Sequence, residues 1–277
     1  MENNMNFNDT QNDNSYKKIK LNLNEKAYIC NKNIRLFDVI DSTNNYLLEY
    51  AKKGSIEHGS VVIAYEQTAG KGRLGRSFYS PPETGLYMSI LIETTALNKE
   101  FSENPTLITV FVAVAAARAI EKKCNIQAKI KWVNDLYYEQ KKICGILTEG
   151  IFNKGKIKTS VIGIGINLCT NNFPNELAGK AGSIFSCKEL PDNFRLELAE
   201  EILNNLFDVV LYAEKTQIID EYKEKSCILG SVVKVISNSE SYEAKAIDIS
   251  FDGELVIEHT NGQKAFLKTG EISLKFT

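Results

Sequence analysis

The chain has 277 residues, enough for one large domain or for one domain with a small second one. Hydrophobic residues make up 43% and charged residues 25%, as is ordinary for an enzyme. The formal net charge of −2 excludes a general basic surface for nucleic acid, and no apolar segment is long enough to span a membrane. We therefore expect neither nucleic acid nor a membrane as a partner.

The six cysteines are scattered and form no CxxC or Cys/His pattern, so no zinc site is expected. Reduced thiols and a polar N-terminus without a signal peptide predict a cytoplasmic protein. The two histidines, His58 and His259, lie far apart in sequence, which disfavours a histidine-based catalytic triad.

The first 33 residues form a polar extension. Residues 1–16 lack an apolar pattern and are predicted to be disordered, whereas 17–33 could form a peripheral strand or arm. A strand is expected at 34–40, and Asp41 to Asn44 then offer side chains that cap a helix ending near Gly54. The later periodicity predicts strands at 60–65, 85–93, 128–132, 136–138, 142–149 and 158–167, and helices at 104–123, 193–213 and 216–225.

The pattern changes near residue 226. Short strands are predicted at 231–237, 243–249, 254–259, 264–267 and 272–276. The dipeptides Asp252-Gly253 and Asn261-Gly262 are strong hairpin signals. We expect residues 34–225 to form the main domain and 226–277 a small β-barrel that leans on it.

The most informative segment is residues 66–76, in which Gly70, Gly72 and Gly75 are interspersed with Lys71, Arg73 and Arg76. Glycine lets the backbone approach a ligand, and exposed N–H groups with cations form an anion site. The Gly-x-Gly-x-x-Gly spacing matches a dinucleotide fingerprint, but the prolines at 81 and 82 argue against the helix that this motif requires. A flexible, solvated surface loop is the alternative.

Three further segments carry polar side chains at or near predicted strands. They are Lys131-Trp132-Val133-Asn134-Asp135, Lys142 at the start of an apolar run, and Gly163-Ile-Gly-Ile-Asn167. Taken singly, each is compatible with an ordinary strand end or core residue.

Together and in this order, these segments resemble the biotin–protein ligases, over residues 34–277. Three positions depart from the family pattern: Lys71 replaces an arginine, Val133 a proline, and Phe78 a common tryptophan. The resemblance implies an α+β fold, a mixed sheet flanked by helices and related to class II synthetases, with an SH3-like barrel at 226–277. The short stretch before Ile34 implies the type without a DNA-binding domain.

The resemblance also implies a two-step reaction. The biotin carboxylate attacks the α-phosphate of ATP, which enters with Mg²⁺, to give biotinyl-5′-AMP. A lysine of a biotin carboxyl carrier domain, in acetyl-CoA carboxylase or another biotin-dependent carboxylase, then takes the biotinyl group. No protein nucleophile is needed, so alignment and charge stabilisation must carry catalysis.

Residue roles are implied at the matching positions. Catalysis is assigned to Arg73, Lys142 and Asp135, the last as the group that orients or deprotonates the amine. The implied biotin contacts are Ser42, Thr43, Asn44, Gln67, Lys71, Gly72, Arg73 and Lys142. The implied adenylate contacts are Gly70, Lys71, Arg73, Arg76, Trp132, Asn134 and Asn167, with Mg²⁺ held through the phosphates near Asn167 rather than by a protein cluster.

Two other functions remain open at this point: a lipoate–protein ligase or related acyl transferase of the same fold, and a biotin sensor without turnover. The sequence leaves the oligomeric state, monomer or homodimer, undecided.

Overall fold

A computed structural model describes residues 16–93, 104–153, 156–186, 189–237 and 240–273. Its centre is an eight-stranded mixed sheet in which β2 and β3 are parallel and all other neighbours antiparallel. In spatial order the strands are β1 (Tyr16–Ile19), β2 (Ile34–Ile40), β3 (Val61–Gln67), β4 (Gly85–Glu93), β8 (Lys156–Asn167), β7 (Lys141–Asn153), β6 (Asp135–Tyr138) and β5 (Lys129–Lys131). The predicted mixed sheet flanked by helices is confirmed.

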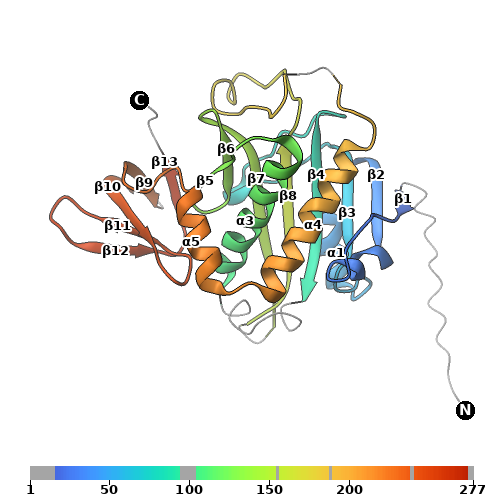
Figure 1. Cartoon of the computed structure of the whole chain (residues 1–277), viewed down its shortest axis with the longest axis horizontal. Coiled ribbons are helices and arrows are strands. Elements are labelled where there is room, and N and C mark those ends of the chain that lie inside the picture. The colour runs from blue at the N-terminus through green and yellow to red at the C-terminus, as the bar shows by residue number, and fades with distance from the viewer. Residues whose placement is uncertain (1–15, 94–103, 154–155, 187–188, 238–239, 274–277) are drawn as a thin grey trace, which may run out of the picture.

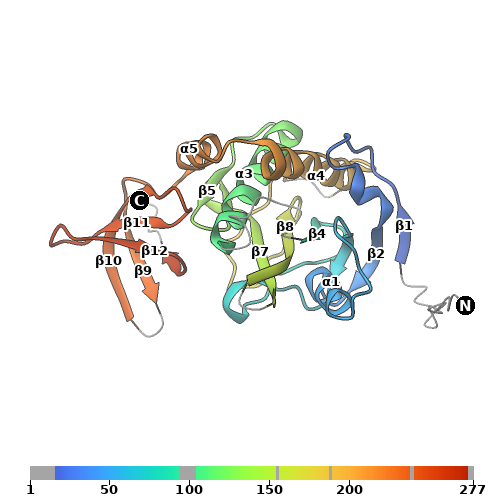
Figure 2. The same cartoon turned by 90° about the horizontal axis from the view of Figure 1, so that it is seen from below.

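Helices cover both faces of this sheet. Helices α3 (Pro105–Cys124) and α4 (Phe194–Tyr212) pack together on one face, and α1 (Thr43–Lys52) lies on the other (Figures 1 and 2). Helix α5 (Lys215–Lys225) follows α4 and leads towards the C-terminal strands. No helix in the described ranges combines the length and apolar character needed to cross a bilayer.

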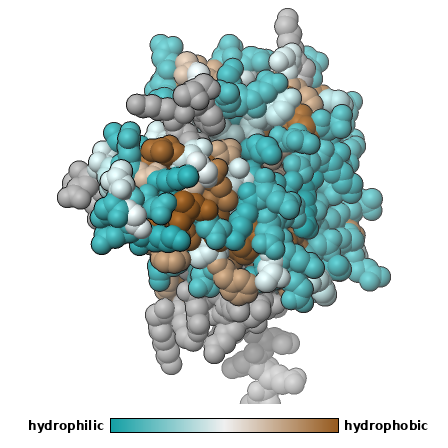
Figure 3. Space-filling model, turned by 60° about the vertical axis from the view of Figure 1, so that its left-hand side comes forward, coloured by the Kyte–Doolittle hydropathy of each residue, from teal (hydrophilic) through white to brown (hydrophobic). Residues whose placement is uncertain are grey.

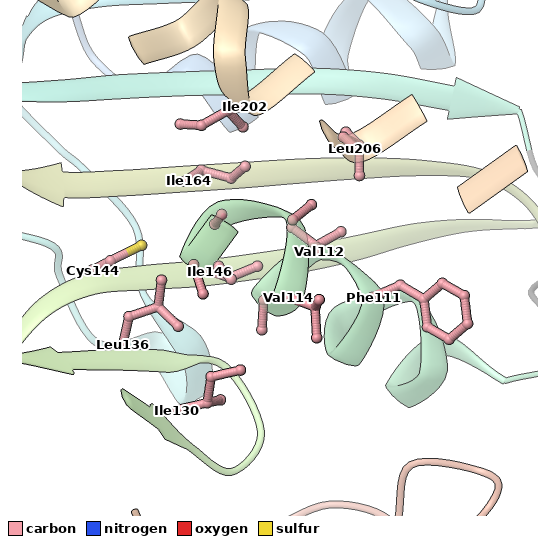
Figure 4. Packing of buried hydrophobic residues seen from close by; sticks show 14 of the residues in the cluster. Phe111, Val112, Val114, Ile130, Leu136, Cys144, Ile146, Ile164, Ile202 and Leu206 are labelled. Carbon is pink, nitrogen blue, oxygen red and sulfur yellow. The ribbon is translucent and has the colours of Figure 1, made fainter. Parts of the chain in front are cut away.

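The strands alternate between two cores, as a period of two requires. On β3, Val61 and Ile63 face the large cluster under α3 and α4, whereas Val62 and Ala64 face the cluster under α1. Figure 4 shows side chains of the large cluster meeting between these helices and the strands. The run of alanines in α3 is completely buried, and such small side chains allow a helix to pack closely against its neighbours.

The chain before Ile34 takes part in this packing. Strand β1 pairs with β2 at the edge of the sheet, which confirms the expected peripheral strand. Leu21, Ala27 and Cys30 are buried in the large core cluster. The packed unit therefore begins before Ile34, while the predicted disorder at 1–16 falls almost wholly outside the described residues.

The C-terminal part forms a separate antiparallel sheet of five strands. Their spatial order is β12 (Lys264–Leu267), β11 (Leu255–Glu258), β10 (Glu240–Ile249), β9 (Val232–Ser237) and β13 (Glu271–Ser273). Gly253 and Gly262 have φ of 79° and 80°, the left-handed backbone that both hairpin signals require. Strands β12 and β13 form the edges of this sheet, so a closed SH3-like barrel stays a prediction.

The C-terminal sheet lies beside α5 at one end of the molecule (Figure 1). Figure 3 shows the face of the molecule at this end. It is largely hydrophilic, with hydrophobic residues gathered near the centre of the face. Residues of the C-terminal part form hydrogen bonds with the segments that carry the predicted site. One is with Trp132, and others are with the glycine-rich loop.

Candidate active site

One pocket brings most of the predicted site residues together. It lies between the start of α1, the glycine-rich loop and strands β7 and β8, and its empty space is about 450 Å³ when the open solvent at its mouth is included. The predicted residues that line it are Ser42, Thr43, Asn44, Gln67, Lys71, Gly72, Arg73, Asn134 and Lys142. Of the other predicted residues, Gly70, Arg76, Trp132, Asp135 and Asn167 are not part of its lining.

The polar end of the pocket is built by the first turn of α1. Ser42 is the N-cap, accepting a hydrogen bond from the Asn45 N–H. Thr43 donates through its backbone N–H, at 2.9 Å, and through its hydroxyl, at 3.1 Å, to Oε1 of Gln67 at the end of β3. Gln67 is itself held by a hydrogen bond from its Nε2 to Ser80. These side chains are thus fixed before any ligand arrives.

Two residues that the sequence did not single out complete this network. Ser89 on β4 is fully buried, and its Oγ lies 2.7 Å from Thr43 Oγ1 and 2.5 Å from Asn44 Oδ1. Glu149 on β7 accepts a hydrogen bond from Asn44 Nδ2 at 2.9 Å. Neither lies within a recognisable motif, and only the pairing of distant strands brings them to α1.

Glycines form the floor of the pocket because side chains lie directly against them. A Cβ on Gly163 would meet Asn44 Oδ1 at 2.2 Å, and one on Gly165 would meet the Phe78 ring at 2.5 Å. Phe78 and Met88 also line the pocket, with Ile146, Leu147 and Ile164. One half of the site is therefore apolar and the other polar.

The glycine-rich loop is folded back on itself. Gly72 N–H donates to the Arg76 carbonyl at 2.7 Å, and a short helical turn at Arg73–Gly75 contains Leu74 with φ of 56°. Gly70 packs so tightly that a Cβ there would meet the Phe78 carbonyl oxygen at 2.4 Å. The fold of this loop directs Arg73 into the pocket and leaves Leu74 exposed.

Arg73 connects three parts of the chain. Its Nη1 donates to Asn134 Oδ1 at 2.8 Å, and its Nη2 to the Gly270 carbonyl at 3.3 Å. Burial lowers the pKa of Arg73, while the charges of Asp135 and Glu271 act in the opposite direction. Arginine nevertheless remains protonated, so a held cation faces the pocket.

Lys142 and Asp135 form an ion pair at the same end of the pocket, with Lys142 Nζ 2.7 Å from Asp135 Oδ1. Lys131 lies on β5, and its Nζ is 5.5 Å from the centre of the Tyr137 ring on β6. Burial lowers the pKa of Lys131; the charge of Asp135 opposes this shift and that of Lys142 adds to it. Because no carboxylate is among the described side chains that line the pocket, its charge suits an anion.

Three residues assigned to the adenylate are engaged elsewhere. Trp132 is 3% exposed and donates its Nε1–H to the Gly253 carbonyl at 2.9 Å, so the structure places the indole in the core. Asn167 is buried and donates to the Gly182 carbonyl. Arg76 points to the surface and pairs with Glu271.

The described residues include no group of three His, Cys, Asp or Glu side chains placed to hold a metal ion. The buried Asn167 amide alone does not provide the carboxylate ligands that Mg²⁺ usually takes from a protein.

The chain is similar to known proteins in both sequence and fold. A model of the Biotin/lipoate A/B protein ligase family matches residues 36–167. The bifunctional ligase/repressor BirA of Bacillus subtilis is 35% identical over 161 residues, which cover 57% of this chain and 48% of the relative. The chain thus spans about half the length of that relative in the match.

Longer matches exist at lower identity. The biotin–[acetyl-CoA-carboxylase] ligase of Mycobacterium tuberculosis is 24% identical over 245 residues, covering 86% of this chain and 88% of the relative. The structure of the biotin protein ligase from Aquifex aeolicus in complex with biotin and ATP superposes with a TM-score of 0.72 at 28% identity, covering 89% of this chain and all of that one. These relatives and structural neighbours are ligase enzymes by name.

Proposed function

We propose that this chain, whose residues 36–167 match a model of the Biotin/lipoate A/B protein ligase family, is an ATP-dependent biotin–protein ligase. In this proposal it activates biotin as biotinyl-5′-AMP and transfers the biotinyl group to a lysine of a biotin carboxyl carrier domain. One observation carries the proposal: a half-apolar pocket has fixed polar side chains at one end and Lys71, Arg73 and Lys142 in its lining.

Biotin fits the two halves of this pocket chemically. Its cyclic urea offers N–H donors and a carbonyl acceptor, which would meet the hydrogen-bonding groups of Ser42, Thr43, Asn44 and Gln67. Its apolar chain would lie along Met88 and the neighbouring aliphatic side chains. The polar groups of the ligand, which become buried on binding, would then find partners in these side chains, since each unmatched one costs about 1–3 kcal/mol.

In the first step, a carboxylate oxygen of biotin forms a bond to the α-phosphorus of ATP and pyrophosphate leaves. Negative charge gathers on the phosphate oxygens, where Arg73, Lys71 and Lys142 would stabilise it. Mg²⁺ would accompany ATP as part of the substrate and offset charge on its phosphates. Asn134 would keep Arg73 aligned, since the two side chains are hydrogen-bonded.

In the second step, the amine of the carrier lysine attacks the acyl carbon of the mixed anhydride, the bond to phosphate breaks and AMP leaves. The attacking nitrogen must be neutral and must lose a proton. Asp135 lies beside Lys142 and is the carboxylate that would orient the amine or accept this proton. A water-excluding loop over the anhydride would favour aminolysis over hydrolysis.

The proposal is tested with purified protein, biotin, ATP and Mg²⁺. Biotin-dependent exchange of pyrophosphate into ATP measures the first step, and labelling of a purified biotin carboxyl carrier domain measures the second. We expect both. Exchange without labelling would indicate that the carrier is wrong, and neither activity together with no biotin binding would refute the proposal.

A lipoate ligase is the second candidate, because the matched family description includes lipoate ligases. Thermal-shift measurements with biotin and with lipoate separate the two, and we expect biotin to stabilise the protein much more than lipoate does. Biotin binding without exchange or labelling would instead indicate a sensor.

A further inference from the structure

The side-chain amide of Asn44 has a charged partner behind the pocket wall. Its Nδ2 donates to Glu149 Oε2 at 2.9 Å and also lies 3.5 Å from the Leu147 carbonyl oxygen. Asn44 lines the pocket and is 3% exposed, whereas Glu149 is not part of the lining. The hydrogen bond to Asn44 therefore connects this carboxylate to the pocket without placing it in the lining.

This contact determines which end of the amide faces the ligand. The oxygen and nitrogen ends have nearly the same shape, so their hydrogen-bond partners decide the orientation. An ionised carboxylate only accepts hydrogen bonds, and placing Oδ1 against it would bring two acceptors together. Asn44 Oδ1 consequently lies beside Ser89 Oγ, at 2.5 Å, and beside Gly163 in the pocket floor.

We propose that Glu149 is a positioning residue that determines specificity by holding the Asn44 carbonyl towards the pocket. An amide oxygen accepts two hydrogen bonds, and Ser89 can supply one of them. The second is available to an N–H group of the ligand. The proposal rests on the proposed function, because the N–H donor in question is that of the cyclic urea of biotin.

The same arrangement disfavours lipoate. The dithiolane ring of lipoate has no N–H group, so it would leave the Asn44 oxygen without a second donor. A site built to hydrogen-bond a donor rejects ligands that lack one. Glu149 would thus raise the preference for biotin over lipoate without touching either molecule.

The binding test uses calorimetry with biotin and with lipoate on Glu149→Leu, Asn44→Ala and the double variant. We expect Glu149→Leu to weaken biotin binding about 10- to 100-fold and to leave lipoate binding unchanged. If Glu149 acts through Asn44, the double variant should bind biotin no more weakly than Asn44→Ala. Additive losses would overturn the proposal, as would equal losses for both ligands.

Two further variants control this test. Glu49→Leu removes an exposed carboxylate from α1, the helix that carries Asn44, and should bind biotin as the wild type does. Glu149→Gln preserves size and polarity if the leucine variant folds poorly. Because its amide can both donate and accept, it allows either orientation of Asn44, so we expect a smaller loss, again confined to biotin.

A ligand-free measurement separates this proposal from the proposed function. The side-chain NH₂ resonances of Asn44, identified by their loss in Asn44→Ala, should exchange slowly with solvent in the wild type. That protection should fall in Glu149→Leu and persist in Glu49→Leu. A wild type that binds no biotin would refute the function alone, whereas unchanged protection in Glu149→Leu would refute the role of Glu149.

Discussion

The guanidinium of Arg73 donates a hydrogen bond to Oδ1 of Asn134 at 2.8 Å, across 61 positions of sequence. Asn134 is fixed in turn by two hydrogen bonds to Ile146. Its side-chain Nδ2 donates to the Ile146 carbonyl at 2.9 Å, and its backbone carbonyl accepts from the Ile146 N–H. The glycine-rich loop is therefore tied to the strand that carries Lys142. The loop cation, Arg73, and the strand cation, Lys142, thus line one pocket from two different elements.

This difference predicts separable kinetic defects. We expect Arg73→Ala to lose retention of biotinyl-5′-AMP, because the loop can no longer hold the anhydride in place. We expect Lys142→Ala mainly to slow its formation, by about 100-fold or more, since a positioned charge at the reacting phosphate is lost. Pyrophosphate exchange measures formation, and release of labelled adenylate into solution measures retention.

Arg73→Lys is the matched control, because it keeps the charge but loses the planar two-pronged donor. It should retain adenylate better than Arg73→Ala and worse than the wild type. If Arg73→Ala and Lys142→Ala both turned over like the wild type, the assignment of both residues would be wrong.

Asp135→Asn should affect the second step more than the first. The amide cannot accept the proton of the incoming amine, whereas the cations around the anhydride remain in place. With preformed biotinyl-5′-AMP, we expect transfer to the carrier lysine to slow by about 100-fold, within the range for one general base. Raising the pH should partly restore the rate by deprotonating the amine. A variant slowed equally in pyrophosphate exchange would place Asp135 in the first step instead.

The surface pair of Arg76 and Glu271, with an N–O distance of 2.5 Å, joins the loop to strand β13. Exposed ion pairs contribute only about 0–1 kcal/mol, so Glu271→Arg should hardly change the free energy of unfolding. It should instead increase proteolytic cleavage within residues 66–80, because like charges then push the loop away from β13.

The double variant Arg76→Glu/Glu271→Arg should restore protection by exchanging the two charges. Addition of biotin and ATP should reduce cleavage of this loop in the wild type. Equal cleavage with and without ligands would contradict the prediction that the loop becomes ordered on binding.

Local patterns were sufficient to predict most of the helices and strands, whereas their arrangement as a mixed sheet flanked by helices came from the family resemblance. Strand β4 coincides with the predicted residues 85–93. Helix α3 begins one residue after the predicted start at residue 104, because Asn104 is its N-cap and accepts hydrogen bonds from the Thr106 and Leu107 N–H groups. Both elements depend on short-range periodicity and capping, which a single sequence displays.

Long-range partners could not be predicted in this way. Glu149 meets Asn44 from 105 positions away, and Glu271 meets Arg76 from 195 positions away. Neither pairing leaves a local signal, because it depends on which strands become neighbours. Trp132 illustrates the opposite case: its motif predicted a nucleotide contact, but the fold directs its indole N–H to Gly253.

Trp132→Phe separates these two roles. Loss of the buried hydrogen bond to the Gly253 carbonyl should lower the free energy of unfolding by about 1–3 kcal/mol, as measured by urea denaturation. Because the indole does not line the pocket, the affinity for ATP should stay within about twofold of the wild type once the folded fraction is corrected for. A variant with unchanged stability and strongly weakened ATP binding would restore the stacking role.

A substitution at Gly165 tests the shape of the pocket floor. The φ of Gly165 is not in the left-handed region, so only space limits a larger residue. A Cβ there would lie 2.5 Å from Cε1 and 2.8 Å from Cζ of Phe78, well inside contact distance. Gly165→Ala should therefore displace the Phe78 ring, destabilise the protein by about 1–3 kcal/mol and weaken biotin binding. Thermal denaturation and calorimetry measure the two effects.

Two variants decide whether the Phe78 ring is the cause. Gly150→Ala lies on β7 and outside the pocket lining. Its Cβ would meet Ile157 Cγ2 at 3.3 Å and Phe152 Cε2 at 3.4 Å, much looser contacts than those at Gly165, so it should be mild in both assays. Phe78→Leu in the Gly165→Ala background should recover part of the lost stability, because the smaller side chain makes room for the new methyl group. If Gly165→Ala alone kept wild-type stability and biotin affinity, Phe78 would not be confined by Gly165, and the pocket floor would be wider than its glycines indicate.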